Sequence, residues 1–205
     1  IQFWTSRGFG VVDVNYGGST GYGRAYREAL HGRWGEVDVA DCVEVARFLA
    51  ARGDVDPQRM VVAGNSAGGF TALCAIAFHD VFAGAAVSYA VTDPTLLLEG
   101  THKFEAHYMD SLIGPYPERA VLYRARSPLQ AAARIRHPLL IMQGLDDRVV
   151  PPTQAEAMVA TARPEYPAPI RANAQARTPT AATEFAKTIP AAWRTRLSMP
   201  PAMTK

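Results

Sequence analysis

Residues 59–77 read RMVVAGNSAGGFTALCAIA and join two different hydrophobic patterns. Residues 60–63 form a short apolar run that predicts a buried strand. The later part has apolar residues at helical spacing and predicts a helix over about 67–79. Between the two lies the tight turn Gly64-Asn65-Ser66-Ala67-Gly68-Gly69. A strand, a glycine-flanked serine and a helix in this order predict a nucleophile elbow, with Ser66 as the nucleophile.

The residue types of this turn suit that chemistry. Gly64, Gly68 and Gly69 would relieve clashes where the backbone is strained and let the strand and the helix approach each other closely. A serine at a helix start lies near free N–H groups and the positive end of the helix dipole, which stabilise an oxyanion. We expect the backbone N–H of Ala67 to donate to that oxyanion. The alternative is a glycine-rich turn in which Ser66 only caps the helix.

The elements around the turn predict an α/β fold. Residues 9–16, 84–89 and 138–143 are short apolar runs that predict further buried strands. Residues 35–52 have the spacing of an amphipathic helix. Strands that alternate with helices and are apolar along their length indicate a mostly parallel sheet with helices on both faces. Residues 90–137 are helical in pieces and follow a strand end, where substrate-contacting insertions are common.

A carboxylate follows the last predicted strand, in the segment Gly144-Leu145-Asp146-Asp147-Arg148-Val149-Val150-Pro151. Ligand and catalytic groups of open parallel sheets gather at the carboxyl ends of the strands. Taken locally, the segment also suits a simple Asx turn before a proline. With Ser66 upstream, the order of serine and then aspartate is that of the α/β-hydrolase triad, in which histidine comes last. The five histidines, however, all precede this segment: His31, His79, His102, His107 and His137.

Composition excludes several other classes. The chain has 205 residues, of which 20% are charged, and its net charge of +2 comes from interleaved signs, which argues against a nucleic-acid partner. We also expect no membrane span, because no apolar stretch approaches the roughly 18 residues that one needs. Cys42 and Cys74 lie in apolar helical patterns and are predicted to be buried thiols in a reducing, cytoplasmic compartment. A second glycine cluster, residues 15–23, lacks the spacing of a phosphate-binding loop and is predicted to be structural.

The sequence resembles the catalytic domain of prolyl oligopeptidase-type serine peptidases, nearest their dipeptidyl-peptidase and acylaminoacyl-peptidase branches. The resemblance extends over residues 1 to about 162. The matching stretches are colinear: 13–23 (DVNYGGSTGYG), 34–41 (WGEVDVAD), 56–59 (DPQR), 64–69 (GNSAGG), 123–128 (YRARSP) and 143–151 (QGLDDRVVP).

The resemblance implies an α/β-hydrolase fold and a serine hydrolase that cleaves short peptides through an acyl-enzyme, without a metal or organic cofactor. It makes Ser66 the nucleophile and Asp147, rather than Asp146, the acid, since the family's catalytic aspartate is followed by two residues and then Val-Pro. Residues 88–110 look like the specificity-pocket region. Its candidate pocket residues are Tyr89, Phe104 and Tyr108, whose rings would line an apolar slot.

The sequence departs from the family pattern at both ends. We expect a fragment, because the chain opens without Met and lacks the family's glycine-rich oxyanion loop and β-propeller. We expect none of the five histidines to replace the missing one, so the chain as written is predicted to be almost inactive. Residues 163–205 are rich in Pro and Ala without any period, and we interpret them as an aberrant tail after a partial domain over 1–162. The hypothesis is that this tail is an out-of-frame translation, which sequencing of the gene would test.

Two alternatives remain open from the sequence. The elbow alone also fits an esterase or lipase of the same fold, and a hydrolase-fold binding protein without activity would explain the missing histidine. Whatever the function, a domain that lacks a closing strand and helix would expose a sheet edge, and we expect this edge to favour association into oligomers.

Overall fold

The computed structural model describes residues 1–98 and 108–162. Of these, residues 15–98 and 108–162 belong to one compact unit, and residues 1–14, with the short helix α1 (Gln2–Thr5), belong to another. The strand predicted at residues 9–16 is not formed. An extended segment becomes a strand only through a hydrogen-bonded neighbour, and the ladders of the described residues all join three other strands.

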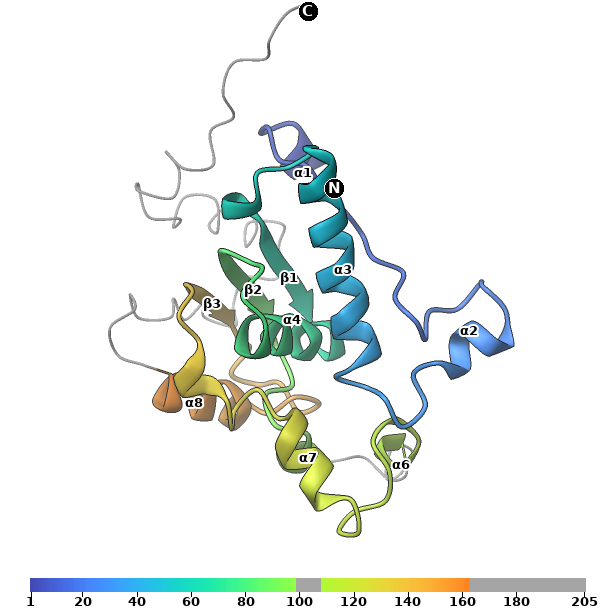
Figure 1. Cartoon of the computed structure of the whole chain (residues 1–205). Coiled ribbons are helices and arrows are strands. Elements are labelled where there is room, and N and C mark those ends of the chain that lie inside the picture. Colours follow the sequence, from blue (N-terminus) through green and yellow to red (C-terminus); the bar gives the residue numbers. More distant parts are fainter. Residues whose placement is uncertain (99–107, 163–205) are drawn as a thin grey trace, which may run out of the picture. The chain divides into compact units, whose positions relative to one another are not determined.

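In the described part of the chain, three parallel strands form the sheet: β1 (Val61–Asn65), β2 (Gly84–Ser88) and β3 (Leu139–Met142). Their order is β1-β2-β3, with Val61 opposite Gly84 and Ala85 opposite Leu139 (Figure 1). This confirms the strands predicted at 60–63, 84–89 and 138–143. Because the strands are parallel, the segments that leave their carboxyl ends all begin at one edge of the sheet.

Helix α4 (Ala67–Phe78) follows β1 and packs against β1 and β2 (Figure 1). It is buried without interruption from Gly69 to Ala77. Strand β1 alternates between exposed and half-buried residues, and Val61 on its outer face is 39% exposed. Helices were expected on both faces of the sheet. In the described ranges, α4 covers one side of β1, and the other side of this strand is exposed.

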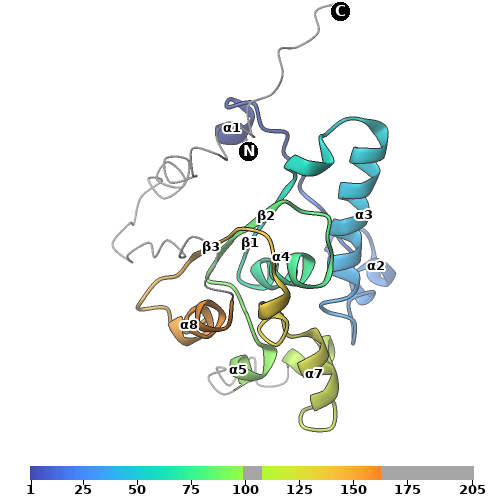
Figure 2. The same ribbon diagram turned by 60° about the vertical axis from the view of Figure 1, so that its left-hand side comes forward.

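Helix α3 (Val37–Arg52) lies beside α4 and matches the helix predicted at 35–52 (Figures 1 and 2). The ring of Trp34, just before α3, lies 4.1 Å from that of Phe70 on α4, measured between centroids. The buried carboxylate of Asp38 accepts from the Gly35 N–H at 2.7 Å and from the Thr71 hydroxyl at 2.5 Å. These contacts fix the start of α4, and with it the turn that holds Ser66.

Arg126 holds the segment before α3 in place. Its guanidinium donates to the carbonyls of Gly32 and Trp34 at 2.9 and 3.1 Å and to the Glu36 carboxylate at 2.6 Å. The side chain is only 8% exposed, and these bonds give its two terminal nitrogens partners, whereas its buried Nε has no hydrogen-bond partner among the described residues. Two stretches that carried the family resemblance, 34–41 and 123–128, are therefore bound to each other.

The remaining described elements are short. They are α2 (Arg24–Glu28), η1 (Pro57–Arg59), α5 (Pro94–Leu98), α6 (Tyr108–Leu112), α7 (Ala120–Arg126), η2 (Ala132–Arg134) and α8 (Pro152–Thr161). Helices α5 and α7 lie beyond the carboxyl ends of the strands (Figure 2). The prediction that residues 90–137 are helical in pieces is confirmed in the described part of this segment.

Both cysteines are free, as expected. Cys74 is fully buried, and burial raises the pKa of the half-buried Cys42 thiol to about 11. Among the described residues, no helix has the length and apolar character that crossing a bilayer requires.

Candidate active site

Ser66 lies at the junction between β1 and α4 in a backbone conformation that L-residues rarely adopt. Its φ is 52° and its ψ is −121°. Tyr89 is the other described non-glycine residue with positive φ. The surrounding hydrogen bonds hold the junction: the Ser66 N–H donates to the Ser88 carbonyl at 3.0 Å, and the Ser66 carbonyl accepts from the Phe70 N–H at 3.1 Å. A strained residue that its neighbours fix in this way is typical of functional sites.

The glycines around Ser66 differ in what they do. A Cβ on Gly64 would overlap the carbonyl group of Gly68, and a Cβ on Gly69 would lie 2.5 Å from the Cβ of Ala90. A Cβ on Gly68 would meet nothing within 4 Å. Close approach of strand and helix therefore requires Gly64 and Gly69, whereas the expectation that Gly68 also relieves a close contact is not met.

The Ser66 side chain does not cap α4. It makes no cap hydrogen bond, although Ser66 stands at the N-cap position. The structural alternative, a serine whose hydroxyl satisfies the helix start, therefore lacks its defining bond. The Ala67 N–H has no acceptor among the described residues, so the half-buried hydroxyl and a free donor meet at one helix terminus.

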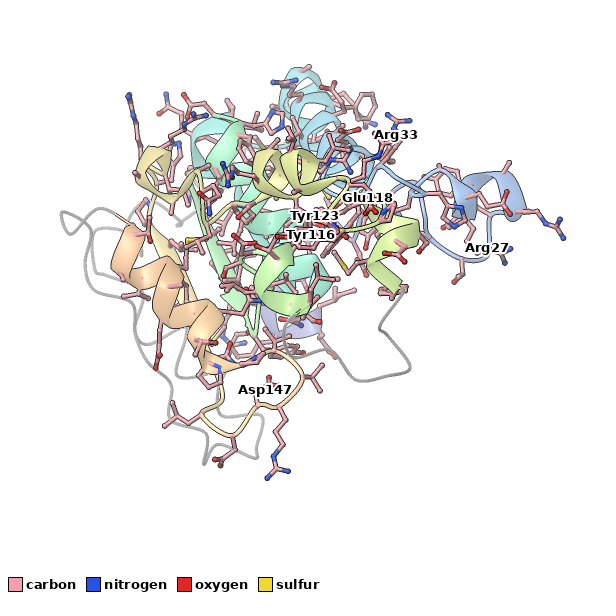
Figure 3. The ribbon with its side chains drawn as sticks, turned by 90° about the horizontal axis from the view of Figure 1, so that it is seen from below. Arg27, Arg33, Tyr116, Glu118, Tyr123 and Asp147 are labelled. Atoms are coloured by element: carbon pink, nitrogen blue, oxygen red, sulfur yellow. The ribbon has the colours of Figure 1, made fainter. Side chains whose placement is uncertain are left out.

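Asp147 lies on the loop between β3 and α8 (Figure 3). Its Oδ1 accepts from the N–H groups of Val149 and Val150, each at 2.9 Å. Asp147 is half-buried, whereas Asp146 is exposed. The loop thus holds one of the two carboxylates in a defined orientation and leaves the other in solvent.

Ser66 and Asp147 follow the outer strands β1 and β3, with β2 between them. Adjacent strands are about 4.8 Å apart, so the axes of β1 and β3 are separated by roughly 10 Å. An imidazole with one hydrogen bond on each side bridges a gap of this order. Tyr89 leaves β2 in this interval with a φ of 38°, and its N–H donates to the Met142 carbonyl at 2.8 Å.

The three pocket candidates have different outcomes. Tyr89 and Tyr108 are 41% and 60% exposed, and Phe104 lies outside the described residues. Tyr108 lies near Tyr16, whose pKa is raised by burial and, to a smaller extent, by Asp38, Cys42 and Tyr108. Their role in a specificity pocket stays a prediction.

Two described histidines, His79 and His137, lie away from the carboxyl ends of β1 and β3. His79 follows the last residue of the 12-residue helix α4, so it is about 18 Å from the end that carries Ser66. His137 precedes β3, at the opposite edge of the sheet, and its Nε2 lies 2.7 Å from Oδ1 of Asp80. His102 lies outside the described residues, as does His107.

Sequence reasoning did not find a buried polar cluster made of Thr92, Asp93, Ser127 and Gln154. Asp93 accepts from the Ser127 hydroxyl at 2.9 Å and from the Thr95 N–H at 2.8 Å, which caps α5. The Asp93-Pro94 pair is a helix-start signal that could have been read from the sequence. The contact with Gln154 spans 61 residues and leaves no local signal.

The chain is similar to known proteins in sequence and in structure. Residues 1–176 match the prolyl oligopeptidase family. Dipeptidyl aminopeptidase BIII of Pseudoxanthomonas mexicana is 27% identical over 164 residues, which are 77% of this chain and 24% of that protein.

Two solved structures are more similar. A puromycin-hydrolyzing peptidase of Mycobacterium tuberculosis has 47% identity and a TM-score of 0.80, over 84% of this chain and 26% of that one. A serine-to-alanine mutant of puromycin hydrolase in complex with PGG has 48% identity and a TM-score of 0.80, with the same coverage of 84% and 26%. The chain spans about a quarter of the length of these relatives.

A parallel sheet whose first described strand ends in a strained serine and a helix defines the chain as an α/β-hydrolase. With the match over residues 1–176, the chain belongs to the prolyl oligopeptidase family.

Proposed function

We propose that this chain supplies the nucleophile and the acid of a serine peptidase. The observation that carries the proposal is the conformation of Ser66, which holds an uncapped hydroxyl at the carboxyl end of β1 with φ at 52°. Asp147 follows β3 at the same edge of the sheet and is the proposed acid. Gly64, Asn65, Gly68 and Gly69 complete the proposed elbow.

The proposed reaction is acyl transfer to the Ser66 hydroxyl. Oγ attacks the peptide carbonyl while a histidine base takes its proton, and Asp147 holds that base through its imidazole N–H. The Ala67 N–H donates to the developing oxyanion. Protonation of the leaving amine gives an acyl-enzyme, which water then hydrolyses. This scheme uses side chains and backbone groups alone.

The proposed substrates are short peptides and small aminoacyl amides. Support comes from the relatives, which include a dipeptidyl aminopeptidase and puromycin-hydrolysing peptidases. Tyr89, Phe104 and Tyr108 are the proposed wall of the pocket for the residue before the cleaved bond. A cytoplasmic location and association into oligomers stay predictions from the sequence.

We further infer that the 205-residue chain alone has activity near background. In the family order the base follows the acid, and no histidine follows Asp147. Loss of one triad member lowers kcat by about four to six orders of magnitude. Out-of-frame translation of residues 163–205 is the proposed origin of this loss, and the DNA sequence of the gene tests it directly.

The experiment uses the protein expressed from the complete gene. Aminoacyl-p-nitroanilides and puromycin are compared with p-nitrophenyl esters for the wild type and for Ser66→Ala, Asp147→Asn and Asp146→Asn. We expect amide hydrolysis, lost in Ser66→Ala and reduced by about 10⁴ in kcat in Asp147→Asn. The matched control Asp146→Asn should stay within about twofold of the wild type, because an exposed carboxylate with no partner among the described residues contributes little.

Two results would contradict the proposal. Hydrolysis of esters without hydrolysis of amides would indicate the esterase or lipase alternative. Absence of both activities in a complete protein that truly lacks the histidine would indicate a non-catalytic binding protein.

A further inference from the structure

One buried amide joins the helix after Asp147 to the chain that leaves β2. Gln154, in the first turn of α8, is 1% exposed. Its Oε1 accepts from the N–H groups of Thr92 and Asp93 at 2.8 and 2.9 Å, and also from the Thr92 hydroxyl at 2.8 Å. Its Nε2 donates to the Asp93 carbonyl at 3.2 Å. Both ends of the side-chain amide are thus used.

The segment that Gln154 binds, Thr92-Asp93, is itself held by further hydrogen bonds. The Thr92 carbonyl accepts from the Leu129 N–H at 3.0 Å, and the Asp93 carboxylate accepts from the Ser127 hydroxyl at 2.9 Å. Three residues earlier, the Tyr89 N–H bonds to the last residue of β3. Gln154 therefore anchors α8 to a part of the molecule that is tied to the sheet.

The chain between Asp147 and Gln154 has little freedom to absorb a shift. Pro151 and Pro152 have fixed φ angles, and Val150 is only 2% exposed. The Gln154 N–H donates to the Pro151 carbonyl at 3.0 Å, and Asp147 is already bonded to the N–H groups that follow it. A displacement of Gln154 is consequently passed on to the Asp147 carboxylate.

A second amide closes the loop at its base. The Nε2 group of Gln143, the residue after β3, donates to the Val150 carbonyl at 3.0 Å. This bond sets the distance between the two ends of the loop, but it does not orient the loop relative to β2. The bonds of Gln154 are the ones that join α8 to the segment after β2.

We propose that Gln154 is a positioning residue, which fixes the Asp147 loop relative to the segment that leaves β2. Because β2 lies between β1 and β3, this fixes the proposed acid relative to the proposed nucleophile. This rests on the proposed role of Asp147. A residue that only filled space could be replaced by leucine with small effect. Here an apolar side chain would leave the buried N–H groups of Thr92 and Asp93 without an acceptor.

The first test needs no activity and uses this chain. Hydrogen exchange of the Val149 and Val150 amides is compared between Gln154→Leu and the control Met158→Ala, which removes fully buried apolar packing from the same helix. We expect both amides to exchange about tenfold faster in Gln154→Leu, relative to amides of β2, because their bonds to Asp147 open locally. Met158→Ala should raise the exchange rates of the loop amides and of the β2 amides by the same factor.

A second variant covers failure of Gln154→Leu to fold. Thr92→Val keeps the shape and the N–H bond but removes the hydroxyl that donates to Gln154 at 2.8 Å. It should raise loop exchange in the same direction by a smaller factor. Equal ratios of loop to β2 exchange in Thr92→Val, Met158→Ala and, where it folds, Gln154→Leu would overturn the proposal.

The second test uses the protein expressed from the complete gene. Gln154→Leu should lower kcat about 10- to 100-fold with KM within about twofold, as expected for misplaced catalytic groups. The acid limb of the pH profile should move to lower pH, because a displaced carboxylate no longer stabilises the protonated base. Met158→Ala should leave that limb unchanged.

The two failures are distinguishable. If Asp147→Asn has wild-type kcat, the proposed function fails while the exchange result still reports on the loop. If Asp147→Asn is inactive and Gln154→Leu keeps both kcat and the acid limb, the positioning role is wrong.

Discussion

At the scale of single residues, the backbone at Ser66 carries a measurable cost. A φ of 52° with a ψ of −121° is unfavourable for a residue with a Cβ, and such conformations cost about 1–3 kcal/mol. Neighbouring hydrogen bonds from Phe70 and to Ser88 keep the residue there. The strain therefore belongs to the fold around the serine and persists without a substrate.

This strain predicts that Ser66→Gly is more stable than Ser66→Ala. Glycine adopts the conformation freely but loses more backbone entropy on folding, so we expect a net gain of about 1 kcal/mol over alanine. Urea unfolding of the two variants measures the difference. Equal stability, or a more stable alanine variant, would mean that the junction relaxes when the hydroxyl is removed.

The glycines of the turn give a matched pair. Gly69→Ala should destabilise the protein by about 1–3 kcal/mol, because its Cβ would lie 2.5 Å from that of Ala90. Gly68→Ala should stabilise it by about 0.5–1 kcal/mol, since the same change in open space only favours the helix. Thermal unfolding measures the Tm of both variants. A change of Tm in the same direction in both would contradict the different roles of Gly68 and Gly69.

At the scale of elements, the join between α3 and α4 depends on the buried carboxylate of Asp38. Burial raises its pKa and outweighs the opposite effect of the bonds from Thr71 and Gly35. The folded state therefore binds a proton more readily than the unfolded chain does. The stabilisation from this proton is complete below the ordinary carboxyl pKa and is lost as the pH rises through the folded-state value.

Asp38→Asn removes this titration and nearly preserves the shape. We expect the free energy of unfolding of the wild type, relative to Asp38→Asn, to fall as the pH rises from about 4 to 7. Urea titrations over that range measure the difference. Parallel pH curves for the two proteins would show that the folded and unfolded states bind the proton equally.

Local patterns predicted the elements that local physics determines. The amphipathic spacing of 35–52 and the apolar runs at 60–63, 84–89 and 138–143 match α3, β1, β2 and β3. The predicted strand at 9–16 failed because a strand needs a partner that its own sequence cannot specify. The sequence also predicted Ser66 and Asp147 as candidates, whereas the Gln154 cluster depends on contacts 61 and 62 residues apart.

At the scale of the whole molecule, the sheet order explains how two distant segments serve one proposed site. Eighty residues separate Ser66 from Asp147 in the sequence, yet both follow parallel strands that flank β2. The buried bonds of Asp38, Arg126 and Gln154 connect the elements that carry them. None of the described residues has been placed as the proposed histidine base at this edge, where the carboxyl ends of the strands lie.

The most direct measurement is covalent labelling by a fluorophosphonate probe, with the modified residue identified by mass spectrometry. In the protein expressed from the complete gene we expect rapid labelling at Ser66 alone, and labelling slowed by several orders of magnitude in Asp147→Asn. The 205-residue chain should label near background. Labelling of another serine in the complete protein, or a rate that Asp147→Asn leaves unchanged, would contradict the pairing of Ser66 with Asp147.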